Sequence, residues 1–333
     1  MPLTPQRIMQ FAFGYAPPLV IEAAIRHNVF DQLDAGPKTA EQIAETSHAS
    51  LRGIRMILNV LVSLELLTKD DDGLYWLTEE SAAFLVSTKP SYFGALIRHT
   101  SEQLLPRWLS LNEVVKTGKP ATRVNDEKEG SDFFQQFVEA IFPMSYAAAS
   151  ALAEALGVSN SESETSVIDL AAGSGVWGIA IALRSPKVHV TAVDWPEVIP
   201  VTRRVAERLG VKDQFNYLEG DLQAVDYGTG FNVATLGHIL HSEGEARSRE
   251  LLRRVYHALA PGGTIAIAEM LADSDRRGPA HAMIFAVNML VNTDNGDTYS
   301  FEEISTWLAD AGFVDARLFD APGPSPLVLA TKP

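Results

Sequence analysis

The sequence predicts an α/β protein in which a doubly wound, Rossmann-like sheet follows an N-terminal α-helical, winged-helix-like domain. Three observations support this fold class. Short apolar runs alternate with amphipathic helices after Val167, helices closed by a hairpin fill the first hundred residues, and a glycine-rich turn follows the first strand of the alternating region. We therefore expect a first domain over 1–100, a helical linker over 101–160 and a sheet domain over 161–333.

The composition is that of a globular protein with a strongly acidic balance. The chain has 333 residues, of which 46% are hydrophobic and 21% are charged, and its net charge is −15. We expect neither nucleic acid nor an anionic membrane as a partner, because phosphates require a positive counterpart. The chain contains no cysteine, which excludes disulfides and thiolate zinc sites. This absence permits a cytoplasmic location, and we expect the protein to be cytoplasmic.

The apolar stretch near the N-terminus lacks the features of a signal peptide or a membrane span. Pro17, Pro18 and Glu22 interrupt it. It also lacks a basic start and a cleavage pattern of small residues.

The first domain is predicted to contain three helices and a hairpin. Helices are expected over 18–27, from Thr39 with Gln42 completing a capping box, and over 50–67. The third helix has an apolar stripe made of Leu51, Ile54, Leu58 and Leu61. The segment "LLTKDDDGLYWLT" then predicts two short strands around an Asp-Gly turn.

This helix–helix–wing outline is typical of DNA-binding domains, but its charge has the wrong sign. Residues 1–100 contain eight basic and eleven acidic side chains, and the wing reads "KDDDG". Phosphate contacts require basic residues. We therefore favour a packing or dimerisation module over a DNA reader.

The linker region is expected to be helical around a polar loop. The segment "SDFFQQFVEAIFPMSYAAASALAEAL" predicts one long apolar helix that begins near Ser131, and the serine-rich stretch "GVSNSESETS" predicts a joint.

The sheet domain places acidic residues where its predicted strands end. The first strand ends at Asp169 and is followed by Gly173, Gly175 and Gly178, a near match to a dinucleotide-binding turn that lacks the lysine of a phosphate loop. The second strand ends at Asp194, 19 residues after Gly175, where a carboxylate can accept hydrogen bonds from ribose hydroxyls. That placement suits a nicotinamide dinucleotide and S-adenosylmethionine (SAM) equally.

Asp221 ends the third strand, where it can accept a hydrogen bond from an adenine amino group. Each acid taken alone also fits a solvated strand end or a helix N-cap. Three acids at the ends of three successive strands favour a nucleoside site.

The ordered segments "VIDLAAGSGVWGIAIA", "VTAVDWPEVI", "GDL", "ILH" and "ALAPGGTIAIAEML" resemble the motifs of class I SAM-dependent methyltransferases. With the N-terminal module, nearly the whole chain resembles the plant-type small-molecule O-methyltransferases, a group that includes bacterial tailoring enzymes and acetylserotonin O-methyltransferase. The resemblance implies a homodimer held by the N-terminal module, and SAM as cofactor. The cofactor residues it implies are Asp169, Gly173, Gly175, Asp194, Trp195, Asp221 and Leu222.

The same resemblance implies a general base. In that family the fourth strand ends in "LHDW", and its histidine deprotonates the acceptor; the matching residue is His241 of "LHSE". Glu269 matches the first of two orienting glutamates. Thr298 stands in place of the second, with the alternative carboxylate Asp297 one residue earlier.

The chain departs from the family at the cofactor edge as well. Gly237 replaces the usual lysine, so either one polar contact to the cofactor is lost or His238 replaces it.

The acceptor pocket is expected to be apolar and aromatic. His281, Phe285 and Met289 share one face of a predicted helix, with Asn292 near it, although a plain core stripe has the same pattern. The resemblance adds Trp108, Phe137, Ile141 and Phe142. Aromatic walls favour a flat acceptor.

The sequence therefore predicts a metal-independent, SAM-dependent O-methyltransferase that acts on an aromatic or polycyclic small molecule. His241 is its expected general base. The altered "HSE" and "GDTYS" segments leave open N- or C-methylation, or SAM-assisted chemistry without methylation, on the same fold. A SAM-responsive DNA-binding regulator is a third hypothesis, which the charge disfavours.

Overall fold

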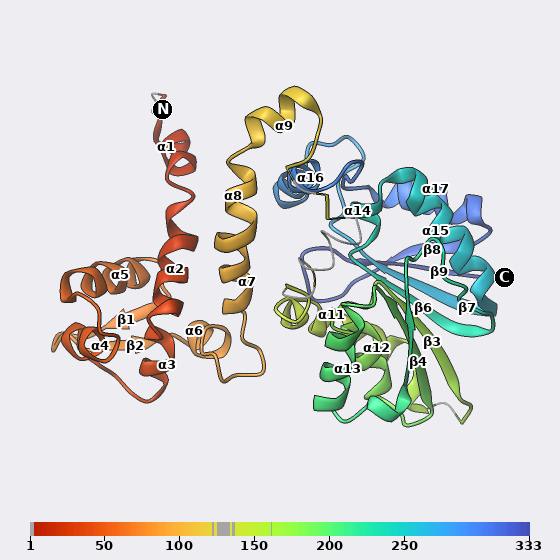
Figure 1. Ribbon diagram of the computed structural model, residues 1–333, viewed down its shortest axis with the longest axis horizontal. Coiled ribbons are helices and arrows are strands. Elements are labelled where there is room, and N and C mark those ends of the chain that lie inside the picture. Colours follow the sequence, from red (N-terminus) through yellow and green to blue (C-terminus); the bar gives the residue numbers. More distant parts are fainter. Residues whose placement is uncertain (1–2, 122, 125–133, 135–136, 161) are drawn as a thin grey trace. The chain divides into compact units, whose positions relative to one another are not determined.

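The computed structural model describes residues 3–121, 123–124, 134, 137–160 and 162–333. The chain folds into two compact units, Met1–Pro106 and Arg107–Pro333 (Figure 1). Each unit has its own hydrophobic core.

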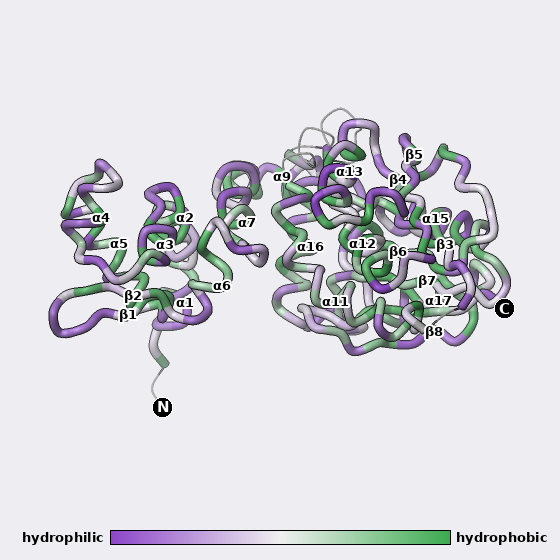
Figure 2. The backbone as a smooth tube through the Cα atoms, turned by 90° about the horizontal axis from the view of Figure 1, so that it is seen from below, coloured by the Kyte–Doolittle hydropathy of each residue, from purple (hydrophilic) through white to green (hydrophobic). Residues whose placement is uncertain are grey.

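The first unit is a small helical domain closed by a two-stranded hairpin. Its elements are α1 (Gln6–Ala12), α2 (Ala16–Arg26), α3 (Val29–Asp34), α4 (Ala40–Thr46), α5 (Leu51–Ser63), β1 (Leu67–Lys69), β2 (Tyr75–Leu77), α6 (Glu79–Phe84), α7 (Gly94–His99) and a π-helical turn (Thr100–Leu104). The predicted capping box is confirmed: the Gln42 N–H donates to Thr39 Oγ1, and the Thr39 N–H donates to Gln42 Oε1. Figure 2 shows the acidic loop between β1 and β2 in the hydrophilic colour.

Two details of this unit differ from the prediction. The third helix, α5, ends at Ser63 rather than near residue 67. Ile54, Leu58 and Leu61 are buried as predicted, but Leu51 is 39% exposed because it lies in the first turn, directly after the N-cap Ser50.

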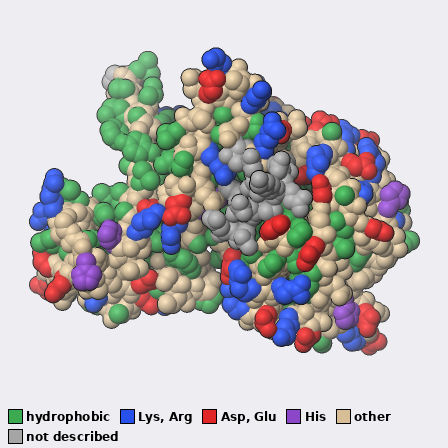
Figure 3. All heavy atoms as spheres, viewed as in Figure 1, with side chains coloured by type: hydrophobic (Ala, Val, Ile, Leu, Met, Phe, Trp, Pro, Cys, Tyr) green, Lys and Arg blue, Asp and Glu red, His purple; other side chains and the backbone are tan. Residues whose placement is uncertain are grey.

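A turn over residues 13–15 separates α1 from α2, and Pro17 and Pro18 lie in the first turn of α2, where prolines remove no intrahelical hydrogen bond. Among the described residues, Gln6–Arg26 taken as one stretch is long and apolar enough to cross a membrane by length and composition alone. Core helices of soluble proteins and signal sequences satisfy the same criterion, so it assigns no membrane role. Much of the apolar surface of α1 is exposed (Figure 3).

The second unit contains the predicted doubly wound sheet, which is confirmed. Its elements are α9 (Leu111–Thr117), α11 (Phe142–Ala155), β3 (Thr165–Leu170), α12 (Val176–Ala182), β4 (Val188–Asp194), α13 (Ile199–Arg208), β5 (Phe215–Glu219), β6 (Phe231–Gly237), α14 (Leu240–Glu243), α15 (Glu245–Ala258), β7 (Leu259–Ala268), α16 (Ala280–Asn292), α17 (Phe301–Ala311), β8 (Val314–Phe319) and β9 (Leu327–Thr331); α8 (Leu105–Trp108) joins the units. Short 3₁₀ turns cover Val158–Asn160 and Lys212–Gln214.

The strand order is β5-β4-β3-β6-β7-β9-β8, parallel except for β9, which is antiparallel to β7 and β8. Alternate residues of the strands serve two cores, one with α12 and α13 and the other with α15 and α17. Figure 1 shows these helix pairs on opposite faces of the sheet.

One predicted helix is shorter than expected. Ser131 lies outside the described residues, and α11 begins only at Phe142, after a turn over residues 138–141. Pro143 explains the break, because it lacks the N–H that would continue a helix from the preceding turn and is tolerated in a first helical turn.

Candidate active site

The carboxyl ends of β3, β4, β5, β6 and β7 meet at one edge of the sheet, and the loops after them carry the candidate residues. The glycine turn after β3 is shaped by close contacts. Gly173 and Gly175 have φ values of 56° and 77°, which favour glycine. A Cβ at Gly178 would lie 2.7 Å from Val190, so this glycine lets α12 pack closely against β4.

Asp169 is fully buried behind this turn. Its Oδ1 accepts a hydrogen bond from Thr235 Oγ1 at 2.7 Å, and its Oδ2 accepts one from the Gly178 N–H at 3.0 Å. Burial raises the pKa of this carboxyl to about 7. Asp169 is fully buried and each of its oxygens bonds to a protein group, so it holds the glycine turn in place. The cofactor contact that the sequence suggested for Asp169 stays a prediction.

Asp194 faces the turn from the end of β4. Its Oδ2 accepts the Gly173 N–H and its Oδ1 accepts the Trp195 N–H, both at 2.8 Å. Burial raises its pKa to about 6, although the two backbone hydrogen bonds act in the opposite direction. Each oxygen retains a lone pair for a further donor. The Trp195 ring packs 6.0 Å from that of Phe134, centroid to centroid.

Asp221 lies at the next strand end, and Leu222 beside it is buried. Sequence reasoning missed a series of charged side chains beside Asp221. Arg247 donates to Glu243 at 2.6 Å and lies 3.5 Å from Asp221 Oδ1. Glu243 and Arg247 are four residues apart across the junction of α14 and α15, a spacing that could have revealed the pair.

His241 and Glu269 form a buried pair. Glu269 Oε2 lies 2.6 Å from His241 Nδ1, and Glu269 Oε1 accepts the backbone N–H of His241 at 3.2 Å. Burial raises the pKa of Glu269, but the charge and hydrogen bond of His241 outweigh burial and leave that pKa below its ordinary value. An ionised Glu269 only accepts hydrogen bonds, so Nδ1 carries the proton in this contact and Nε2 is left to accept one. The His241 ring also meets the edge of Phe285, with centroids 4.9 Å apart.

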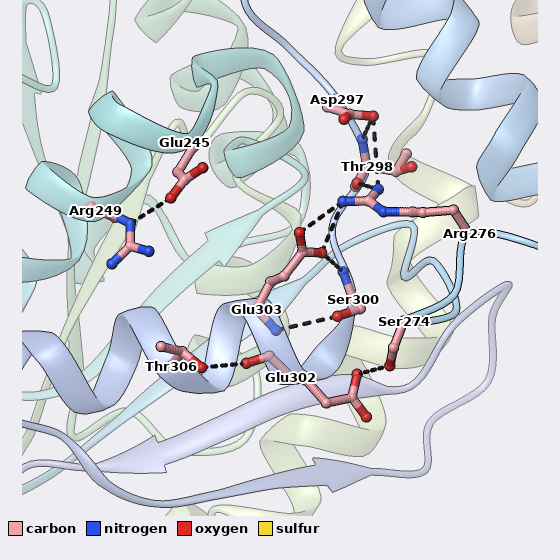
Figure 4. A network of polar contacts seen from close by, with 10 residues as sticks. All are labelled: Glu245, Arg249, Ser274, Arg276, Asp297, Thr298, Ser300, Glu302, Glu303 and Thr306. Carbon is pink, nitrogen blue, oxygen red and sulfur yellow. Dashed lines mark hydrogen bonds and ion pairs between the residues drawn. The ribbon is translucent and has the colours of Figure 1, made fainter.

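The Asp297 side chain does not take part in this pair. In the described structure its carboxylate accepts the Thr298 N–H and lies 3.9 Å from Arg276, and only its backbone N–H reaches His241, donating to the carbonyl oxygen at 2.9 Å. The expected orienting role is corrected accordingly: the one-residue offset turns the carboxylate away. Figure 4 shows Asp297 and Thr298 beside Arg276, which also binds Glu303.

Thr298, at the position of the second glutamate, is fully buried, and its Oγ1 has no hydrogen-bond partner among the described residues.

The predicted acceptor residues are only partly brought together. Phe285 contacts His241, and Met289 is buried, whereas His281 is exposed at the start of α16. Trp108 donates to Asn288 Oδ1 at 2.9 Å, and Asn292 accepts from Arg107.

The residues predicted before and at the start of α11 are described by their burial and ring contacts. Phe137 and Ile141 are half-buried, and the Phe142 ring stacks on Tyr146 with centroids 5.3 Å apart.

His238 adopts a left-handed backbone conformation, with φ 61°, at the end of β6. Its ring centroid lies 6.2 Å from that of His241, and its buried Nδ1 has no hydrogen-bond partner in the described structure. Burial lowers its pKa to about 4, so the ring is neutral at pH 7.

Trp177 explains why the neighbouring position lacks a lysine. A Cβ at Gly237 would lie 2.1 Å from the indole Nε1 of Trp177, so any larger residue conflicts with this indole. Sequence reasoning missed Trp177, although a large aromatic residue inside the glycine motif "GSGVWG" was a signal.

Family models match both units of the chain. A model of the O-methyltransferase domain matches residues 116–314, and a model of the O-methyltransferase dimerisation domain matches residues 9–87. The chain belongs to the O-methyltransferase family. The resemblance drawn from the sequence motifs is therefore confirmed, and SAM is the cofactor of this methyltransferase.

Known methyltransferases are similar to this protein over nearly its whole length. A 3-hydroxy-5-methyl-1-naphthoate 3-O-methyltransferase from Streptomyces sahachiroi is 30% identical over 98% of this chain and 95% of its own. The tetracenomycin polyketide synthesis 8-O-methyl transferase TcmO from Streptomyces glaucescens is 28% identical over 99% of this chain and 97% of its own. Human N-acetylserotonin methyltransferase, solved in complex with SAM, aligns with a TM-score of 0.87 and 25% identity over 98% of this chain and 97% of its own.

Proposed function

We propose that this O-methyltransferase methylates a hydroxyl group of an aromatic or polycyclic small molecule and that His241 is its general base. The observation that carries the proposal is the buried His241–Glu269 pair, which leaves Nε2 as the nitrogen able to accept a proton. An acceptor hydroxyl is a weak nucleophile until it is deprotonated, so a positioned base accelerates transfer.

Glu269 has two tasks in this proposal. Its hydrogen bond to Nδ1 fixes the ring orientation and the tautomer, and its charge stabilises the imidazolium that forms when Nε2 takes the hydroxyl proton. The second contact, from Glu269 Oε1 to the backbone N–H of His241, ties the start of α14 to the end of β7. The base is therefore held by main chain and side chain together.

The residues at the strand ends fit SAM. The Asp194 carboxylate has free lone pairs for ribose hydroxyls, and the glycine turn after β3 allows close approach of a ligand to the backbone. We propose Gly173, Gly175, Asp194 and Trp195 as direct contacts, with Asp221 and Leu222 at the adenine end and His238 at the catalytic end. When bound, SAM supplies an electrophilic methyl carbon on a sulfonium.

An aromatic acceptor is supported by two observations. The Phe285 ring lies against the base, where it can pack on a flat ring. The two Streptomyces relatives act, by their names, on a hydroxynaphthoate and in tetracenomycin polyketide synthesis. We propose that Trp108, Phe137, Ile141, Phe142, His281, Met289 and Asn292 shape the wall of the pocket more remotely.

A homodimer is the proposed assembly. Residues 9–87 match a dimerisation domain, and α1 exposes apolar side chains that water does not favour. These exposed side chains are Ile8, Met9 and Phe11.

The test replaces His241 by alanine and measures methyl transfer to a hydroxynaphthoate. We expect kcat/KM to fall by about 10²- to 10⁴-fold, while SAM binding, measured by calorimetry, stays close to that of the parent. His257→Ala, which changes an exposed histidine on α15, serves as the matched control and should keep full activity. Unchanged transfer by His241→Ala would refute the base assignment.

A further inference from the structure

His238, His241 and Glu269 are arranged as potential metal ligands. One ligand atom from each residue lies within 4.8 Å of the other two, and these three form the one such group of histidine, cysteine and acidic side chains in the described part of the chain. Two imidazoles and one carboxylate are a common ligand set for zinc, with an open fourth position.

The unused nitrogen of His238 is the second observation. Its Nδ1 is buried without a hydrogen-bond partner among the described residues, although buried polar atoms are usually paired. The left-handed backbone of His238 and its N–H bond to the Ala268 carbonyl at 2.8 Å fix the start of this side chain beside β7, the strand that leads to Glu269.

The third observation is a cavity of about 20 Å³ that His238 and Glu269 line together with Trp177 and Ser145. A space of this size holds about one water molecule. His241 does not line this cavity, so the space lies on the His238–Glu269 side of the group, where it gives room for a water beside a cation that these two residues hold.

We propose that His238, His241 and Glu269 form a binding site for a borderline divalent cation such as Zn²⁺, and that its occupation blocks methyl transfer. Zinc–nitrogen bonds are about 2.0–2.1 Å long, so the three side chains must draw closer by rotation. The proton on His241 Nδ1 moves to Nε2 or to solvent, and the hydrogen bond between His241 and Glu269 is exchanged for a bond from each residue to the ion. Imidazole and carboxylate ligands favour Zn²⁺, Ni²⁺ and Cu²⁺ over Mg²⁺.

The inhibition, unlike the binding, rests on the proposed role of His241 as base. An ion bound by His241 and Glu269 occupies the groups that orient the base. It also takes the Glu269 carboxylate away from its hydrogen bond with His241. The chain has no cysteine, so zinc cannot inhibit it through a thiol.

The direct test titrates the full-length, cofactor-free protein with Co²⁺, a spectroscopic substitute for Zn²⁺, and follows its visible absorption. Zn²⁺ affinity is then measured by displacement of the Co²⁺. We expect one ion per chain, and at least about tenfold weaker binding by His238→Phe, since even outer contacts of metal ligands contribute 10- to 100-fold. His189→Gln, an exposed histidine on β4, is the matched control and should bind as the parent does.

Glu269→Gln provides a second variant that preserves side-chain volume, in case His238→Phe fails to fold by near-ultraviolet circular dichroism. Absence of stoichiometric binding by the parent, or parent-like affinity in the folded ligand variants, would overturn the site. A parallel assay measures methylation of a hydroxynaphthoate at increasing Zn²⁺. Loss of activity that tracks occupancy supports the whole proposal, whereas binding without inhibition retains the metal site and refutes His241 as the essential base.

Discussion

At the scale of single residues, three carboxylates of this enzyme differ in what they can do. Asp169 is fully buried and bonds to protein groups, Asp194 is partly exposed at the end of β4, and Glu269 is paired with His241. All three carry the same chemical group, so their surroundings alone distinguish the structural role of Asp169 from the binding and orienting roles proposed for Asp194 and Glu269.

Asp194 predicts a pH dependence of cofactor binding. Its pKa is raised to about 6 by burial, and only the ionised form accepts hydrogen bonds through both oxygens. SAM affinity should therefore be full above this pKa and decline as the pH falls through it. Calorimetry with SAM between pH 5 and pH 8 measures this, and Asp194→Asn should bind weakly with little dependence on pH. A parent affinity that is constant over this range would contradict the assignment.

Gly237 predicts a steric effect. Gly237→Ala places a methyl group where the Trp177 indole lies, 2.1 Å from Nε1. Overpacking of this kind costs about 1–3 kcal/mol of unfolding free energy, measurable by urea denaturation. The double variant Gly237→Ala with Trp177→Leu should recover part of the loss. No recovery would show that the indole is not the obstacle.

Sequence patterns predicted what depends on local order and missed what depends on contacts between segments. Strand ends placed Asp194, Asp221 and His241 at one edge, because a strand and its following loop are adjacent in the chain. The direction of Asp297 and the contact of Trp177 with Gly237 depend on how distant segments pack, which periodicity does not encode.

At the scale of elements, the segment before α17 contacts the main chain of His241, the proposed base. Ser300 caps α17 in a capping box with Glu303, Glu303 binds Arg276, and Arg276 also donates to the Thr298 carbonyl oxygen (Figure 4). The Asp297 N–H at the other end of this segment donates to the His241 carbonyl oxygen. The capping box thus helps to hold the segment whose Asp297 N–H donates to the His241 carbonyl oxygen.

Ser300→Ala tests this coupling. Loss of the cap should lower the unfolding free energy by about 1 kcal/mol, and the loosened segment should lower kcat more than it changes SAM affinity. Thr306→Ala removes a hydroxyl that only donates to the Glu302 carbonyl oxygen within the same helix, so it is the matched control. Equal effects of both substitutions on kcat would contradict the coupling.

At the scale of the whole molecule, exposed apolar surface and net charge act in opposite directions on assembly. A charge of −15 repels a second copy, whereas the apolar side chains of α1 favour burial. The dimerisation-domain match indicates that burial prevails.

The proposed dimer can be tested by adding charge to α1. The parent should have about twice the chain mass of 36.3 kDa by light scattering. Ile8→Asp with Phe11→Asp should shift it to the monomer, because charge on a contact surface opposes burial. Gln10→Asp adds charge at a polar position of the same helix and should leave the mass unchanged. A double variant that stays dimeric would place the interface elsewhere.

The position of Trp177 beside Gly237 also makes its intrinsic fluorescence a reporter of changes in the site. The indole belongs to α12, which begins at the glycine turn, and it lines the same small cavity as His238 and Glu269. Its fluorescence should therefore respond both to ligands at the turn and to events around the histidines. Comparing the emission of the parent with that of Trp177→Phe would let each binding event be followed in real time without an attached dye.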